Sequence, residues 1–192
     1  MSTLRIILII GVVAVGIFMF YRLSPGRSRL EIRGEENRFP IVSGANLDRA
    51  EMEFPRDFGG EYNLILVPFQ RYQQETVNTW IPFAQKMERD YEEFMYYEFP
   101  TIRSMPAFSR TFINEGMRAG IPDPVSRERT ITLYLDKESF KRDLGIETER
   151  DISLFLVDTS GRILWRESGE YNPKIAGELE TLLADLSRDG AE

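Results

Sequence analysis

Cysteine and histidine are both absent from this chain of 192 residues. Without cysteine there is no disulfide framework and no thiolate nucleophile. Without histidine there is no imidazole base, which excludes a Ser-His-Asp triad, and the joint absence excludes most zinc sites. An oxygen-only metal site stays open, although the sequence offers no ligand loop for one. We therefore expect neither a cofactor nor a metal.

Charge is divided unevenly along the chain. The formal net charge is −7, which argues against nucleic-acid binding. Residues 1–38 hold six arginines and three glutamates, a charge of +3, whereas the rest holds 18 basic and 28 acidic residues, a charge of −10. A basic neck on an acidic body suits a chain whose neck meets anionic lipid. The length predicts one domain with its own core.

One long apolar run stands near the start of the sequence. The segment "IILIIGVVAVGIFMFY", Ile6–Tyr21, has sixteen uncharged residues. As a helix it would span roughly 24 Å, slightly less than a hydrocarbon core of about 30 Å. The following "RLSPGRSR" is a poor signal-peptidase site, which favours an uncleaved anchor over a signal peptide. We expect a transmembrane anchor over residues 1–23, with residues 4–23 in the bilayer.

The arginines around this run predict its orientation. Only Arg5 precedes it, whereas four follow it: Arg22, Arg27, Arg29 and Arg33. The positive-inside rule then places the body in the cytoplasm, as a single-pass protein of the inner or plasma membrane. Residues 24–38 are polar, basic and without a stable period, which predicts a linker.

Residues 39–192 are predicted to form one domain of alternating strands and helices. An extended lead-in with short strands covers residues 39–63. Strands are expected at residues 63–69, 94–99 and 129–136, and helices at residues 70–91, 104–121 and 137–145. A hairpin around "VDTSGRILW", residues 157–165, and a helix over residues 172–186 follow. This order predicts an α/β fold whose parallel sheet gains an antiparallel edge from the hairpin.

The element order resembles the thioredoxin fold with a peroxiredoxin-type insertion. In those families the redox cysteines stand where the first central strand meets its helix. Here that junction reads "FQRYQQETV", residues 69–77, and Gln73, Gln74 and Val77 mark a degenerate redox corner. The cis-proline that those families place before the hairpin is also missing, at about Asp151. The resemblance therefore implies a thioredoxin-like protein that is not an enzyme, because thiol–disulfide exchange needs a thiolate.

A narrower resemblance rests on several quoted stretches. They are "FPRDFGG", "NLILVPF" followed by "QQETVNTW", "INEGMRAGIPDPVSRERTITLY" and above all "FLVDTSGRILWRESGEY". In these the chain is similar to the assembly factors of the mitochondrial F-type ATP synthase and their bacterial relatives. That resemblance implies a non-catalytic, membrane-anchored protein that binds a subunit of a larger membrane complex as an assembly factor or chaperone.

Two other functions remain open at this point. The first is a permanent accessory subunit of a respiratory or photosynthetic membrane complex, which sequence alone does not separate from a transient factor. The second is a degenerate thioredoxin- or peroxiredoxin-like enzyme. The absence of cysteine, histidine and any glycine-rich phosphate loop counts against an enzyme.

Four residues are candidates for contact with a partner. Arg118, Arg127 and Arg129 lie in the stretch 116–129, which we expect to be a long loop near the carboxyl ends of the strands. Arginine suits bidentate recognition of carboxylates, although internal ion pairs or scattered surface charge would explain the same residues. Trp165 is either an exposed anchor for a partner or a side chain packed on the last helix.

Two further residues have alternative interpretations. Trp80 lies on the apolar stripe of its predicted helix, which favours core packing. Glu98 follows an aromatic strand and would be either an acid in a pocket or, as we expect, a solvated or ion-paired side chain.

Overall fold

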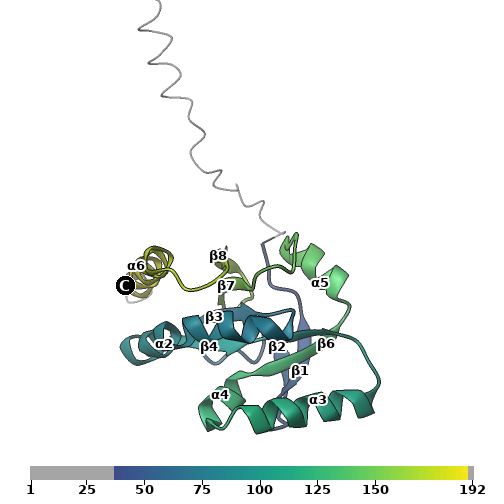
Figure 1. Cartoon of the computed structure of the whole chain (residues 1–192). Coiled ribbons are helices and arrows are strands. Elements are labelled where there is room, and N and C mark those ends of the chain that lie inside the picture. Colours follow the sequence, from purple (N-terminus) through teal and green to yellow (C-terminus); the bar gives the residue numbers. More distant parts are fainter. Residues whose placement is uncertain (1–36, 190–192) are drawn as a thin grey trace, which may run out of the picture. The chain divides into compact units, whose positions relative to one another are not determined.

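The computed structural model describes residues 37–189 (Figure 1). The predicted anchor and nearly all of the predicted linker lie outside these residues. Within 37–189, no helix has both the length and the apolar character needed to cross a membrane.

The described part alternates strands and helices. The strands are β1 (Val42–Asn46), β2 (Glu51–Phe54), β3 (Tyr62–Val67), β4 (Phe94–Glu98), β5 (Thr101–Arg103), β6 (Ile131–Leu135), β7 (Ser153–Asp158) and β8 (Ile163–Ser168). The helices are η1 (Arg71–Gln73), α2 (Gln74–Asp90), α3 (Ala107–Gly120), α4 (Pro124–Arg129), α5 (Lys137–Leu144) and α6 (Pro173–Asp189).

The strands form two four-stranded ladders, in the orders β2-β1-β6-β5 and β4-β3-β7-β8. They meet where β4 runs into β5, and Glu98 pairs there with Thr130. The pairs β3–β4 and β5–β6 are parallel, and β7 and β8 add an antiparallel edge. The predicted parallel centre with a terminal hairpin is therefore confirmed, and the lead-in supplies a second antiparallel hairpin, β1–β2, beside β6.

The burial of strand β3 explains why its sequence is almost continuously apolar. All six of its residues are buried. Successive side chains of a strand point to opposite faces. Leu64 and Leu66 join one hydrophobic cluster, whereas Ile65 and Val67 join the other. Both faces of the central strand are thus covered, as the unbroken run predicts.

Helices α2 and α6 cover one face of the β4-β3-β7-β8 ladder. Trp80 of α2 is fully buried there, and its indole N–H donates to the Gly169 carbonyl at 2.9 Å. Its predicted place in the core is confirmed. Helix α6 begins as predicted, because the Asn172 side chain caps it by accepting from the Lys174 N–H at 2.9 Å.

The stretch 116–129 is not a loop, which corrects the sequence prediction. It contains the end of α3, a short connection and all of α4. The Asp123 carboxylate caps α4 by accepting from the Ser126 N–H at 2.7 Å, and Pro124 occupies the first helical position. The same Asp-Pro signal is legible in the sequence. Helices α3 and α4 form the lower edge of the domain in Figure 1.

The "VDTSGRILW" hairpin closes through its aspartate and glycine. One Asp158 carboxylate oxygen accepts from the backbone N–H groups of Ser160 and Arg162, both at 2.9 Å. Gly161 has φ +84°, and a Cβ there would come within 2.9 Å of the Pro55 ring. The turn therefore requires glycine for its backbone angle as well as for the space.

Candidate functional site

The corner where redox cysteines would stand is built on the side chain of Gln73. This residue is 1% exposed. Its carbonyl oxygen accepts from the N–H groups of Phe69 and Gln70 at 2.7 and 3.1 Å, and its amide donates to the Glu149 carbonyl at 2.8 Å. Gln73 thus satisfies the backbone of the strand-to-helix turn and ties it to the segment before β7.

The carboxylate of Glu149 accepts hydrogen bonds and forms ion pairs at the same corner. Its oxygens lie 2.6 Å from the Lys137 ammonium and 3.1 Å from that of Lys141. The Gln70 amide donates to it at 2.9 Å. Burial alone would raise the pKa of Glu149, but these hydrogen bonds and the lysine charges outweigh burial and lower it. The corner is a cluster of hydrogen bonds and ion pairs that contains no thiol.

The other two corner residues point elsewhere. Val77 is buried in the core beneath α2. The Gln74 amide donates to the Asn78 side chain at 3.1 Å and to the Glu98 carboxyl at 3.2 Å. The degenerate corner is therefore linked to Glu98 by the hydrogen bond from Gln74.

Glu98 is an acid in a pocket, and the expectation of a solvated or ion-paired side chain was wrong. It is 3% exposed and, within the described residues, forms no ion pair. Burial raises the pKa of its carboxyl, opposed only by the hydrogen bond from Gln74. The cavity it lines has a volume of about 240 Å³. The residues that line it come from α2, the end of β4 and the α3–α4 region: Gln74, Asn78, Ile81, Pro82, Glu98, Ile121 and Ser126.

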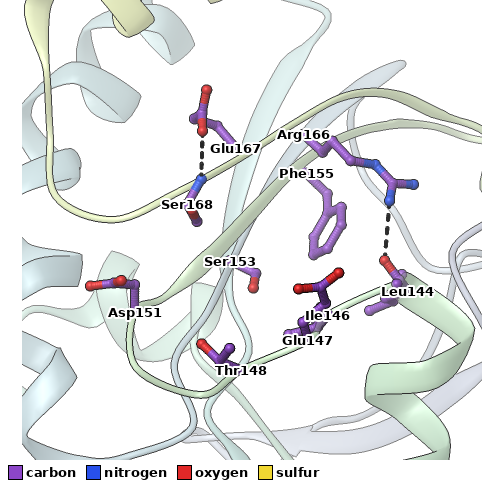
Figure 2. A pocket seen from close by; sticks show the side chains of 11 residues that line it. Leu144, Ile146, Glu147, Thr148, Asp151, Ser153, Phe155, Arg166, Glu167 and Ser168 are labelled. Carbon is purple, nitrogen blue, oxygen red and sulfur yellow. Dashed lines mark hydrogen bonds between the residues drawn. The ribbon is translucent and has the colours of Figure 1, made fainter. Parts of the chain in front are cut away.

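A second cavity, of about 360 Å³, lies between the end of α5, the loop after it and β8 (Figure 2). Arg166 crosses it, donating to the Leu144 carbonyl at 3.2 Å and to the Asn37 side chain at 2.7 Å. Its guanidinium also lies over the Phe155 ring. Burial lowers the pKa of Arg166. Asp151, at the place expected for a cis-proline, also lines this cavity. Arg166 is the one basic residue among the described residues that line it, and its guanidinium is taken up by these internal contacts.

The three candidate arginines form ion pairs within the domain rather than one shared surface. Arg118 and Arg127 both reach Asp48, at 3.7 and 3.1 Å, while Arg129 pairs with Glu88 of α2 at 3.3 Å. None of the three lines either cavity. Their role toward a partner stays a prediction, and the alternative of internal pairing describes their observed contacts.

Trp165 is half-buried on β8, opposite Leu156 in the ladder. It packs against the hydrophobic cluster that contains Leu179 and Leu183 of α6. This contact is the one expected of a structural side chain, and a role as partner anchor stays a prediction.

Sequence reasoning missed the most exposed aromatic residues of the described part. Phe108 and Phe112 of α3 are 87% and 79% exposed. The helical spacing holds a signal for them, because Phe108 and Phe112 share one side of the helix while Ile113 and Met117 lie on another. A helix with two apolar sides cannot bury both against one sheet.

No protein-family model and no curated protein match this chain. Solved structures do. Yeast Sco1 with copper bound superimposes with a TM-score of 0.52 at 10% identity, over 79% of this chain and 95% of that one. The fold is thioredoxin-like. BsSco, of the Sco family of cytochrome c oxidase assembly proteins, gives 0.50 at 14% identity, over 79% and 97% of the two chains.

A third neighbour is the exposed lipoprotein thioredoxin Etrx1 of Streptococcus pneumoniae strain TIGR4. It gives a TM-score of 0.50 at 11% identity, over 76% of this chain and 99% of that one. Identities this low establish the fold alone. The predicted mixed α/β, thioredoxin-like class is confirmed.

Proposed function

We propose that this chain is a non-catalytic binding protein that recognises a subunit of a larger membrane complex, as an assembly factor or chaperone. The observation that carries the proposal is helix α3. It has no buried residue, and it exposes two phenylalanines one turn apart, Phe108 and Phe112. Exposed aromatic pairs of this kind are typical anchors at protein interfaces.

The closed corner supports a non-catalytic role. The whole chain lacks cysteine, so no thiolate can attack a disulfide. Gln73 and Glu149 fill the corresponding space with hydrogen bonds that reinforce the fold. The thioredoxin-like scaffold is then retained for its surface rather than for its chemistry.

The surface of α3 suits a helical or extended apolar segment. Burying one phenylalanine side chain contributes about 1.5–3 kcal/mol, so two supply a useful anchor. Gly116 and Gly120 continue the same side of the helix, and no described atom outside the adjacent backbone of α3 lies within 4 Å of where their Cβ atoms would stand. A partner backbone can therefore approach α3 closely beyond the two rings.

A membrane complex is favoured over a soluble partner by two arguments. The predicted anchor at residues 4–23 would hold the domain at a bilayer, with the body in the cytoplasm. The resemblance to assembly factors of the F-type ATP synthase names one candidate complex. BsSco, which shares the fold, belongs to a family of cytochrome c oxidase assembly proteins, so this scaffold serves assembly elsewhere.

The test is recovery of the partner by the full-length, tagged chain in mild detergent, read by mass spectrometry. We expect a subunit of a membrane complex to be recovered, and the double variant Phe108→Ser/Phe112→Ser to reduce its yield about tenfold or more. The matched control is Ile41→Ser/Tyr72→Ser, which removes two other exposed apolar side chains and should leave the yield unchanged.

Two results would contradict the proposal. One is wild-type recovery by the Phe108→Ser/Phe112→Ser variant. The other is disulfide-reductase activity of the pure protein in an insulin-reduction assay. Stoichiometric recovery with the mature complex would instead identify the chain as a permanent accessory subunit.

A further inference from the structure

The cavity beside α2 contains a buried acid whose charge has no counter-charge. Glu98 ends β4 and is 3% exposed. Among residues 37–189 its carboxyl receives one hydrogen bond, from the Gln74 amide at 3.2 Å, and no lysine or arginine lies within ion-pairing distance. Transfer of an unpaired carboxylate out of water is unfavourable. Such a group either keeps a proton or takes a cation.

The walls of the cavity suit an aliphatic cation. Gln74, Asn78 and Ser126 form the polar wall of the cavity beside Glu98, while the apolar wall comes from Ile81, Pro82 and Ile121. A volume of about 240 Å³ accommodates a short alkyl chain that ends in an ammonium or guanidinium group. Amide and hydroxyl oxygens complement the N–H donors of such a group.

Residues 37–189 do not supply this cation. The two arginines that follow the lining residue Ser126 form ion pairs elsewhere, Arg127 with Asp48 and Arg129 with Glu88. Within the described part of the chain, no basic side chain lines the cavity. Residues 39–192 carry 18 basic and 28 acidic residues, so the field of the domain also favours a cation from outside.

We propose that this cavity is a receptor for an organic cation, an ammonium or guanidinium on an aliphatic stem, with Glu98 as its counter-charge. The cation is supplied either by a lysine or arginine side chain of a bound protein or by a free small amine. The proposal does not depend on the proposed function, because a small cation binds the cavity whether or not α3 has a partner.

The first experiment titrates the full-length chain in mild detergent with n-propylguanidinium and n-butylammonium. Binding is followed by NMR of the side-chain amides of Gln74 and Asn78, which line the cavity. We expect saturable shifts with dissociation constants of about 1–10 mM, typical of one ion pair with a short stem. The uncharged probe n-propylurea, of similar shape, should give no saturable shift.

The decisive variant is Glu98→Gln, which keeps an acceptor for the Gln74 amide and removes the charge. It should weaken binding of both cations about tenfold or more, since it deletes the charged partner. The matched control Glu75→Gln removes a charge from an exposed position in the first turn of α2 and should leave the titration unchanged. Equal binding by wild type and Glu98→Gln, or equal binding of n-propylurea, would overturn the proposal.

The source of the cation is settled by a second measurement. If Glu98→Gln also lowers recovery of the protein that binds α3, the cation is a side chain of that protein. If recovery is unchanged while n-propylguanidinium still binds the wild type, the cation is a free small molecule. A partner that binds normally to Phe108→Ser/Phe112→Ser contradicts the proposed function only, and leaves the titration as it stands.

Discussion

Helices α2 and α3 both follow a strand of the parallel centre, yet they relate to the sheet in opposite ways. Helix α2 buries five side chains: Val77, Trp80, Phe83, Ala84 and Met87. Helix α3 buries none. The strands beneath them explain the difference, because Leu64 and Leu66 of β3 share a hydrophobic cluster with α2, whereas β6 presents Thr132 and Tyr134 to α3.

Helix α3 is therefore held by polar and half-buried contacts. The Tyr134 hydroxyl hydrogen-bonds the Asn114 side chain at 2.7 Å, and the Arg110 guanidinium lies over the Tyr134 ring. An element held in this way keeps its largest apolar side chains in solvent. The contrast shows that two amphipathic helices can differ in how many apolar side chains they bury. The side chains of the facing strand determine which helix packs closely on the sheet.

The largest expected effect lies on the α2 side of this comparison. Trp80→Ala should lower the free energy of unfolding by about 3–5 kcal/mol, because it empties a fully buried site and removes the indole hydrogen bond to Gly169. Urea unfolding followed by circular dichroism measures the loss. A loss below about 1 kcal/mol would show that the core beneath α2 tolerates the cavity.

A smaller loss is expected at the start of α2. Gln73→Ala should lower the free energy of unfolding by about 1–3 kcal/mol, because the N–H groups of Phe69 and Gln70 lose their acceptor. Asn78→Ala, at an exposed position of the same helix, is the control. Equal losses of unfolding free energy for the two variants would show that the hydrogen bonds of Gln73 do not stabilise the turn.

A pH-dependent difference should follow from Glu98. Its folded pKa is raised by burial above its ordinary value of 4.5. The stability linked to this group is therefore present below that value and is lost as the pH rises through the raised pKa. The free energy of unfolding of Glu98→Gln should therefore increase relative to that of the wild type over this interval, as measured by urea unfolding from pH 4 to 8. A constant difference across the range would show that Glu98 titrates as an exposed acid does.

The smallest effect lies on α3. Phe108→Ala and Phe112→Ala should each change the free energy of unfolding by about 0.5 kcal/mol or less, since both rings are in solvent. Thermal unfolding of the two variants beside Trp80→Ala completes the comparison. A loss above about 1 kcal/mol for either would mean that the side chain supports the fold and is not free for a partner.

The sequence predicted the elements that carry a clear period or stop signal. Strand β3, helix α2 and the capped helix α6 lie where their patterns place them, because each reflects local spacing or a local cap. Helix α4 was missed although its Asp-Pro start is legible, since the two prolines at its start, Pro122 and Pro124, suggested a loop. Local signals therefore explain both the successes and this error.

The candidate site was less predictable, because its contacts join distant parts of the chain. Gln73 meets Glu149, which is 76 residues away in sequence, and no spacing rule announces that bond. The pocket at Glu98 needs Ile121 and Ser126 to arrive from the α3–α4 region. The candidate arginine Arg127 forms an ion pair with Asp48, which is 79 residues away in sequence. Phe108 was not a candidate, because only the structure shows its exposure.

The absence of buried side chains in α3 has a dynamic consequence. The two ladders share one hydrophobic cluster, which includes Ile65 of β3 and Leu133 of β6, so they should open together. Helix α3 buries no side chain and is expected to open at a lower free energy than the strands. A protein that binds α3 would then slow amide hydrogen exchange mainly in that helix, so the proposed recognition surface is also the part that binding makes rigid.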